Sequence, residues 1–172
     1  MLYFAYGSNM SVKRIKNRIA SVCKKGTGEL KGYKIVCNKM SNDESLKFNI
    51  QNDVNESVFG VVYNVSDDDL DELDKFEGVI KSGKSKGKGY IREIVKVIYN
   101  DNSVEAITYI CTCGEKIDNS GENKPYSWYV KHALIGAREA ELDRLYIEEY
   151  INIKSKEDGD KGRVKRELKI YS

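Results

Sequence analysis

The chain contains very little proline and histidine and has no long apolar run. It has one proline and one histidine in 172 residues, so rigid linkers and an obvious boundary between domains are not expected. No stretch approaches the roughly 18–20 apolar residues of a membrane-spanning helix. The amino-terminal residues also lack the positive and apolar regions of a signal peptide. We therefore expect no membrane partner and a cytoplasmic location.

The sequence also has no excess of charge of one sign. It carries 29 Lys and Arg against 27 Asp and Glu, a net charge of +2. Dedicated nucleic-acid-binding domains are usually far more basic, so we expect no nucleic-acid partner. With 40% hydrophobic and 33% charged residues, the composition is typical of a globular domain that is long enough to bury a sizeable core.

The cysteines do not form a recognisable metal-binding pattern. There are four, at irregular spacings, at positions 23, 37, 111 and 113. Cys111 and Cys113 are two residues apart in a strand-like segment, which points both side chains the same way. Further ligands would be needed, and the single histidine, His132, adds little. We expect reduced thiols and no metal site.

Short apolar or alternating segments predict a set of strands. They lie at residues 2–6, 28–39, 45–51, 57–65, 90–99 and 105–113. The last two are joined by a turn that contains Asp101 and Asn102. Strands interspersed with helices, without regular βαβ units, predict an α+β fold built on one curved sheet.

Three helical patterns accompany these strands. The first follows Ser11. The second has a capping box of Ser66 and Asp69 at its start and Gly78 at the position of a C-terminal cap. The third begins at Tyr126 and continues through residue 151. These signals predict where each helix begins and ends.

The remaining segments are polar. Residues 81–88 form a basic, glycine-containing loop, and a second polar loop precedes Tyr126. We assign residues 1–153 to a single domain. Residues 154–172 form a charged tail, which we expect to be loose at least in its first half.

The amino-terminal segment joins a predicted buried strand to a polar turn. Gly7, Ser8 and Asn9 follow directly on the apolar residues 2–6. Gly7 permits a positive φ, and Ser8 and Asn9 bring hydrogen-bonding side chains to the turn. Backbone N–H groups at such a turn converge on an anion that lies at the start of the following helix. An N-capped turn without a ligand is the alternative.

Glu77 shares a helical face with apolar residues. In the helix predicted after Ser66, Leu70, Leu73 and Glu77 stand at i, i+3 and i+7, which form one stripe. A carboxylate on the face that the leucines bury loses hydration, so its charged form is disfavoured unless a cation pairs with it. Such a group suits general acid–base chemistry near neutral pH. The alternative is that Glu77 swings out to solvent around Gly78.

Several segments, in order, resemble the γ-glutamylcyclotransferase (AIG2-like) family. They are "YFAYGSN" at 3–9, "KFNI" at 47–50, "FGVVYNV" at 59–65, "LDELDKFEGV" at 70–79, "YIREIVKV" at 90–97 and "SWYVKHALIGA" at 127–137. The first segment alone is weak, but the ordered set is specific and covers most of residues 2–150. The resemblance implies a small closed β-barrel, mixed or antiparallel, with flanking helices and one cavity.

The resemblance also implies roles for particular residues. Glu77 occupies the position of the family's acid/base glutamate. The substrate-binding residues implied are Tyr3, Phe4, Ala5, Tyr6, Gly7, Ser8, Asn9 and Tyr129. Tyr6 and Tyr129 would orient substrate through their hydroxyls, although each could equally be a core or rim aromatic among the twelve tyrosines of the chain.

The implied reaction needs no cofactor. The α-amine of a γ-glutamyl substrate attacks its own γ-carbonyl carbon and releases 5-oxoproline and a free amine or amino acid. The turn at residues 7–9 would bind the α-carboxylate or donate to the developing oxyanion, and the sequence does not separate these uses. We expect a monomer or a homodimer.

The sequence does not determine the leaving amine. Family members act on γ-glutamyl amino acids, on γ-glutamyl-ε-lysine, or on γ-glutamyl groups that protect an antibiotic intermediate. The basic loop 81–88 would favour an acidic leaving group, although such loops are more often simply solvated. The alternative function is a non-catalytic small-molecule-binding protein of the same fold. Retention of Glu77 beside "YGSN" argues against it.

Overall fold

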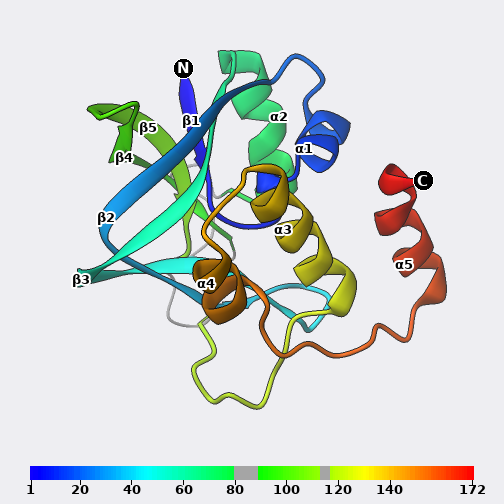
Figure 1. Cartoon of the computed structure of the whole chain (residues 1–172). Coiled ribbons are helices and arrows are strands. Elements are labelled where there is room, and N and C mark those ends of the chain that lie inside the picture. Colours follow the sequence, from blue (N-terminus) through cyan, green and yellow to red (C-terminus); the bar gives the residue numbers. More distant parts are fainter. Residues whose placement is uncertain (80–88, 113–116) are drawn as a thin grey trace.

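Five strands close into a mixed barrel (Figure 1). The computed structural model describes residues 1–79, 89–112 and 117–172. The strands are β1 (Leu2–Ala5), β2 (Cys23–Met40), β3 (Leu46–Asn64), β4 (Ile91–Tyr99) and β5 (Asn102–Ile110), in the order β1-β3-β2-β4-β5. β1 pairs antiparallel with β3 and parallel with β5. The predicted α+β barrel is confirmed.

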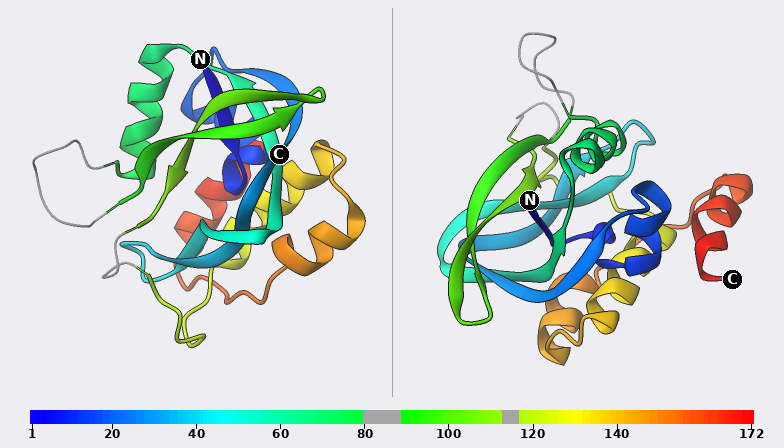
Figure 2. Two further views of the ribbon diagram at one scale, coloured as in Figure 1. Left: turned by 90° about the vertical axis from the view of Figure 1, so that its left-hand side faces the viewer. Right: turned by 90° about the horizontal axis from the view of Figure 1, so that it is seen from above.

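The helices gather on one side of the barrel (Figures 1 and 2). They are η1 (Ser8–Met10), α1 (Val12–Arg18), α2 (Asp67–Glu77), α3 (Ser127–Glu139), α4 (Arg144–Tyr146), η3 (Ile147–Ile151), α5 (Lys161–Leu168) and η4 (Lys169–Tyr171). No helix within the described ranges is both long and apolar enough to span a membrane.

β3 is one long strand where the sequence predicts two. Residues 46–51 and 57–64 belong to one continuous strand. Its register with β2 passes from the Tyr33–Asn52 pair to the Lys31–Ser57 pair, so residues 53–56 have no partner in that register. These mostly exposed residues have a composition typical of a loop, although the strand continues through them. Gly32, at φ 80°, accompanies a register shift between Lys31 and Tyr33 where the hairpin bends. Pairing on both sides of this irregularity carries the strand across the polar segment.

The hairpin that joins β4 to β5 turns one residue earlier than predicted. Asn100 and Asp101 both have positive φ, at 48° and 61°, and Asn102 already belongs to β5. Positive φ at both central residues is typical of the tight turns that fit the twist of two strands. Asn and Asp tolerate this conformation better than most residues.

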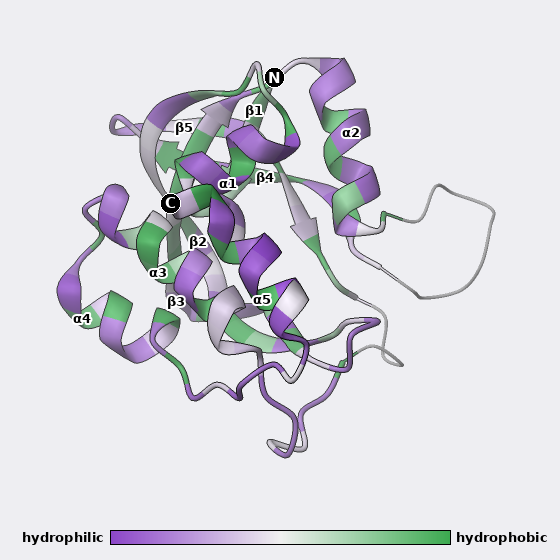
Figure 3. Ribbon diagram, turned by 90° about the vertical axis from the view of Figure 1, so that its right-hand side faces the viewer, coloured by the Kyte–Doolittle hydropathy of each residue, from purple (hydrophilic) through white to green (hydrophobic). Residues whose placement is uncertain are grey.

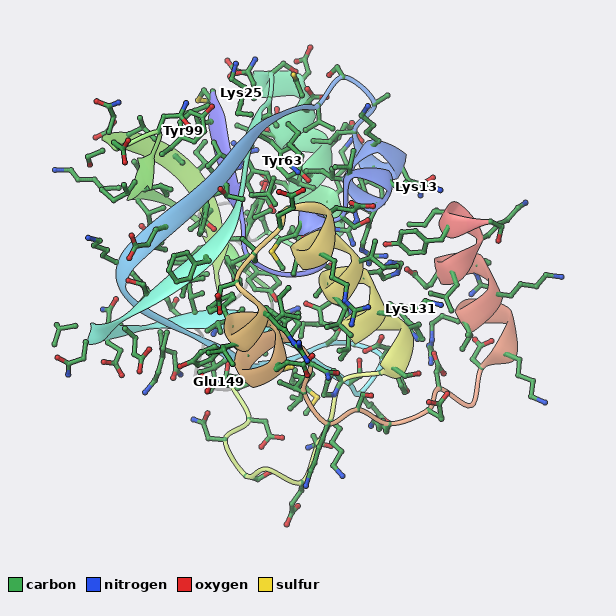
Figure 4. All side chains as sticks on the ribbon, in the orientation of Figure 1. Lys13, Lys25, Tyr63, Tyr99, Lys131 and Glu149 are labelled. Carbon is green, nitrogen blue, oxygen red and sulfur yellow. The ribbon has the colours of Figure 1, made fainter. Side chains whose placement is uncertain are left out.

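The core lies inside the barrel and between the barrel and the helices. Apolar residues concentrate on these inner faces, and polar residues on the outer faces of the helices (Figure 3). Tyr63 points into the interior, whereas Lys25 and Glu149 lie at the periphery (Figure 4). The buried Tyr63 hydroxyl donates to the Met10 carbonyl at 2.8 Å, which ties β3 to η1 and fixes the turn at the end of β1.

α2 begins and ends where the sequence predicts. The side chain of Ser66 accepts from Asp69 N–H, and the side chain of Asp69 accepts from Ser66 N–H, so the capping box is complete. Gly78 takes the left-handed conformation at φ 65°. Leu70 and Leu73 are buried. The stripe that carries Glu77 therefore does face the protein.

The third helical segment is interrupted, and the expectation of one helix from 126 through 151 is wrong. α3 ends at Glu139, Glu141 has a positive φ of 55°, and the side chain of Asp143 caps a new helix. Gly136 explains the close approach of α3 to the amino-terminal turn, since a Cβ there would lie 2.2 Å from Ser11 N. The amphipathic pattern of the sequence continues through residues 140–143 and therefore does not indicate the break between α3 and α4.

The charged tail is docked, so the expectation of a loose tail is wrong for its described residues. α5 and η4 lie beside α1 and α3 (Figures 1 and 2). Asp158, in the first half of the tail, is buried and accepts from the indole N–H of Trp128 at 2.8 Å. Glu167 forms a 2.6 Å ion pair with Arg14. Whether residues 1–153 form a separate domain stays a prediction.

The cysteines of the described residues, at positions 23, 37 and 111, form no disulfide with one another. Cys37 is largely buried, and burial raises its pKa to about 12. The predicted alignment of Cys111 with Cys113 lies outside the described residues, as does the basic loop 81–88.

The buried histidine under the tail makes stability pH-dependent. Nε2 of His132 lies 3.2 Å from Glu167 Oε2, and burial lowers the pKa of His132 to about 4. An unfolded histidine titrates at about 6.5, so between these values the unfolded state binds more protons. The free energy of unfolding should fall as pH drops from about 6.5 to about 4, by roughly 3 kcal/mol at the lower end.

Urea denaturation across this pH window would measure the effect, with a His132→Gln variant as control. His132 is the single histidine of the chain, so the variant should show a shallower pH dependence. The hydrogen bond from His132 and the charge of Arg14 lower the pKa of Glu167 to about 2. The contribution of Glu167 to the free energy of unfolding is therefore lost mainly below about pH 4.5. If the free energy of unfolding changed equally with pH in the two proteins, His132 would not be the source of the pH dependence.

Candidate active site

A pocket opens at the end of β1, between the turn that follows it and α2. The empty space within its walls, including the part that is open to solvent, is about 290 Å³. The lining is mostly aromatic: Tyr3, Tyr6, Gly7, Ser8, Asn9, Phe48, Glu77, Tyr90, Tyr109 and Tyr129. One carboxylate, that of Glu77, therefore faces a ring of phenols and a backbone turn.

Of the substrate-binding residues that the resemblance implies, the structure brings six to the pocket and leaves two outside it. The six are Tyr3, Tyr6, Gly7, Ser8, Asn9 and Tyr129. Phe4 and Ala5 are fully buried in the core, against Gly60 of β3. Successive side chains of a strand point to opposite faces, so Phe4 points away from the side that carries Tyr3.

The turn after β1 has a different geometry from the one predicted. Gly7 has φ −120°, so the expected positive φ is wrong. Close packing explains the glycine instead, because a Cβ there would lie 3.3 Å from Phe48 Cβ and 3.6 Å from the Tyr129 hydroxyl. Within η1 the first donor is Met10 N–H, which bonds to Gly7 O at 3.0 Å. The N–H groups of Ser8 and Asn9 are therefore not used by the helix itself.

Glu77 is held inside the pocket wall by contacts from two other elements. Arg18 donates to Glu77 Oε1 at 2.6 Å and to Asn9 Oδ1 at 2.9 Å. Asn9 Nδ2 donates to the same Glu77 oxygen at 3.0 Å. The glutamate side chain is only 16% exposed, so the alternative in which it swings out to solvent is wrong. Arg18 is therefore the cation that pairs with the Glu77 carboxylate on this buried face.

The pocket tyrosines differ in which of their hydrogen-bonding atoms stay available. Tyr6 and Tyr90 donate their hydroxyl protons to backbone carbonyls, of Tyr109 and Phe48 respectively, so toward a ligand they can only accept. The Tyr129 hydroxyl accepts from Phe48 N–H at 2.9 Å, which leaves its proton free to be donated. Burial raises the pKa of Tyr129 and of Tyr6, so both are neutral phenols at neutral pH.

Asp74 anchors the helix that carries Glu77. It is buried, pairs with Arg92 Nε of β4 at 2.6 Å, and accepts from the Tyr109 hydroxyl at 2.9 Å. Asp74 lies one turn before Glu77, so these contacts fix the end of α2 against the barrel. The position of Glu77 thus depends on a second carboxylate that does not line the pocket.

Sequence reasoning missed several residues of this site. Arg18 was not singled out, although with Arg14 it stands at i, i+4 on one helical face. Asp74 was not singled out either, although it follows Leu70 by four residues and so shares its helical face. No pattern in the sequence around Tyr109 indicates that it lines the pocket. In the described parts of the chain, no three or more His, Cys, Asp or Glu side chains are grouped to hold a metal ion.

The fold and the site define a class of protein. The family model described as "Gamma-glutamyl cyclotransferase, AIG2-like" matches residues 3–131. That match covers most of the chain, and the protein belongs to this family. The matched range includes both the turn after β1 and Glu77.

Solved structures agree with this assignment. The chain is similar to the human "uncharacterized protein loc79017", with 27% identity and a TM-score of 0.79 over 98% of this chain and 97% of that chain. A structure described as "Gamma-glutamyl cyclotransferase" is similar at 26% identity and a TM-score of 0.79, over 98% of each chain. YkqA from Bacillus subtilis shares the fold, with 20% identity and a TM-score of 0.67 over 91% of this chain and 55% of that chain. No curated protein matches.

Asp74→Ala should destabilise the protein by about 2–4 kcal/mol, because it leaves the Arg92 guanidinium and the buried Tyr109 hydroxyl without this acceptor. Urea denaturation measures this loss as a change in the free energy of unfolding. Asp71→Ala is the matched control. Asp71 also pairs with Arg92, at 3.0 Å, but is 62% exposed, so its loss should cost under about 1 kcal/mol. Similar losses for the two variants would show that Asp74 does not anchor α2.

Proposed function

We propose that the protein is a γ-glutamylcyclotransferase that converts a γ-glutamyl amide into 5-oxoproline and a free amine, with Glu77 as the general acid/base. The observation that carries the proposal is the position of Glu77. Its carboxylate lies in the wall of an aromatic pocket, opposite a turn with two N–H groups not used by η1. Membership in the cyclotransferase family supports the same reaction.

The substrate brings its own nucleophile, so the first task of the pocket is to fold it. The α-amine nitrogen and the γ-carbonyl carbon must meet to close a five-membered ring, and holding them together supplies an effective-molarity gain. The tyrosine rings give the pocket a rigid wall, since Tyr6 and Tyr90 are buried and tied to backbone carbonyls.

Proton transfer is the second task. The α-ammonium must lose one proton to become a nucleophile and another as the ring closes, while the leaving nitrogen gains two and departs as an ammonium. Glu77 accepts protons from the α-nitrogen and returns them to the leaving nitrogen. A carboxylate is the form that pairs with Arg18, and it is also the form that accepts a proton.

The remaining polar groups of the pocket bind and orient the substrate. The backbone N–H groups of Ser8 and Asn9 would hold the α-carboxylate or the developing oxyanion. The Tyr129 hydroxyl, whose proton is free, would donate to a substrate oxygen. The hydroxyls of Tyr6 and Tyr90 can only accept, which suits the α-ammonium group.

A panel of γ-glutamyl compounds tests the reaction directly, with release of 5-oxoproline as the readout. The alternative function is a small-molecule-binding protein that keeps the barrel without the chemistry. That alternative predicts binding of γ-glutamyl compounds with no 5-oxoproline formed, so the same panel, followed by calorimetry, separates the two.

Glu77→Gln tests the role of the carboxylate. Glutamine keeps the shape and can still accept from Arg18 and Asn9, but it cannot take up a proton at neutral pH. Turnover should fall by about 10²–10⁴-fold, while substrate affinity should survive because the turn after β1 is intact. Steady-state and binding measurements on the same preparation provide both values. Full 5-oxoproline-forming activity in this variant would refute the mechanism.

Gly7→Val tests the turn. The valine methyl groups would extend from a Cβ already 3.3 Å from Phe48 Cβ and 3.6 Å from the Tyr129 hydroxyl, and so would enter the pocket. We expect substrate affinity to be lost, with the fold largely kept, as judged by calorimetric titration and far-UV circular dichroism. Unchanged affinity in a folded variant would contradict the assignment of this turn to substrate binding.

A further inference from the structure

A second pocket adjoins the first across a shared wall. Ser8, Glu77, Tyr90 and Tyr129 line both. The empty space of the second pocket, including the part that is open to solvent, is about 390 Å³. If the γ-glutamyl group folds against the first pocket, its scissile amide lies at Glu77. The leaving half of the substrate then extends into the second pocket.

The second pocket is lined by an unusual concentration of cations. We call it the cationic pocket, after the side chains of Arg14, Arg18, Lys39 and Lys47. Among the described residues of its lining, Glu77 is the one carboxylate. Glu77 is already paired with Arg18.

The two lysines lie against the tyrosines of the shared wall. Lys39 Nζ is 4.7 Å from the ring centre of Tyr90, and Lys47 Nζ is 4.7 Å from that of Tyr129. Lys39 and Lys47 are also direct partners in the register of β2 and β3. Like charges directly opposite in a strand pair are destabilising. An anion bound between them would relieve this repulsion.

Arg14 gives independent evidence for an anion site. It is buried, and one of its terminal nitrogens binds Glu167 at 2.6 Å. Its Nε is also buried and has no hydrogen-bond partner in the part of the chain that the structure describes. An unpaired buried N–H carries a desolvation cost, which a carboxylate in the cationic pocket would remove.

Two further acids of the described residues contact these cations. Asp43 contacts Lys47 at 3.1 Å and Glu167 contacts Arg14, both from outside the lining of the pocket. Burial lowers the pKa of Lys47, and the charges of Arg14 and Lys39 lower it further, against the opposing effect of Asp43. The cations therefore act on one another across the pocket.

We propose that the cationic pocket selects γ-glutamyl substrates whose leaving amine is an acidic amino acid, so that carboxylates of the leaving group lie between Lys39, Lys47 and Arg14. This inference rests on the proposed function for the orientation of the substrate. Leaving amines that are neutral or carry extra positive charge bring no additional negative charge to this cluster of cations.

The test compares two nearly isosteric substrates, γ-glutamyl-glutamate and γ-glutamyl-glutamine. We expect kcat/KM for the first to exceed that for the second by roughly tenfold or more, the range for one charge-assisted hydrogen bond. γ-Glutamyl-ε-lysine should be poorer than both. Equal values for the first two, or a preference for the glutamine or lysine compound, would overturn the proposal.

Variants of Lys47 assign the preference to the pocket. Lys47→Met should bring the ratio of the two kcat/KM values toward one, whereas Lys47→Arg, which keeps the charge, should preserve most of it. Lys16→Met is the matched control, because Lys16 is exposed on α1 and its loss changes the net charge equally. Because Lys47 also contacts Asp43 and aromatic rings, Lys39→Met serves as a second variant. An unchanged ratio in both methionine variants would exclude these lysines.

Equilibrium binding separates failure of this proposal from failure of the proposed function. If neither peptide yields 5-oxoproline, the proposed cyclisation is wrong. Calorimetric titration of both peptides into the protein then tests whether the cationic pocket prefers the acidic peptide. Tighter binding of γ-glutamyl-glutamate that is lost in Lys47→Met would support it. Equal binding of the two peptides would overturn it.

Discussion

Asn9, Arg18 and Glu77 come from η1, α1 and α2 and meet at one oxygen, Glu77 Oε1. Each contact needs the others, because Arg18 also bonds to the Asn9 carbonyl oxygen, and Asn9 also donates to the Tyr3 hydroxyl. A carboxylate in this position without a cation would carry a large desolvation cost. The arrangement places a charged group inside the pocket wall while all three elements stay packed on the barrel.

The barrel and α3 hold the turn that supplies Asn9. β1 pairs with β3 on one side and β5 on the other, so the chain leaves the closed barrel at a fixed point. α3 then packs against the turn at Gly136, where no side chain intervenes. The site is thus built on strands and helix ends, which position groups more precisely than free loops do.

The two adjoining pockets divide the proposed chemistry between them. The aromatic pocket is suited to a folded glutamyl group, and the cationic pocket to the amine that departs. The docked tail takes part indirectly, because Glu167 pairs with Arg14, which lines the cationic pocket. Two acids of the tail have partners on α1 and α3: Glu167 contacts Arg14 and His132, and Asp158 accepts from Trp128.

Local sequence determined the caps of α2, the stripe of Leu70 and Leu73 that turns Glu77 inward, and the strand and turn at residues 2–9. These depend on neighbours within one or two turns, and the ordered resemblance added the barrel and the family. Only the tertiary structure decided that Arg18 pairs with Glu77, that Lys39 lies opposite Lys47, and that the tail docks. Arg18–Glu77 and Arg14–Glu167 join residues far apart in the chain, and they depend on how the helices pack. Lys39 and Lys47 are close in sequence, but a one-residue slip in the register of β2 and β3 would separate them.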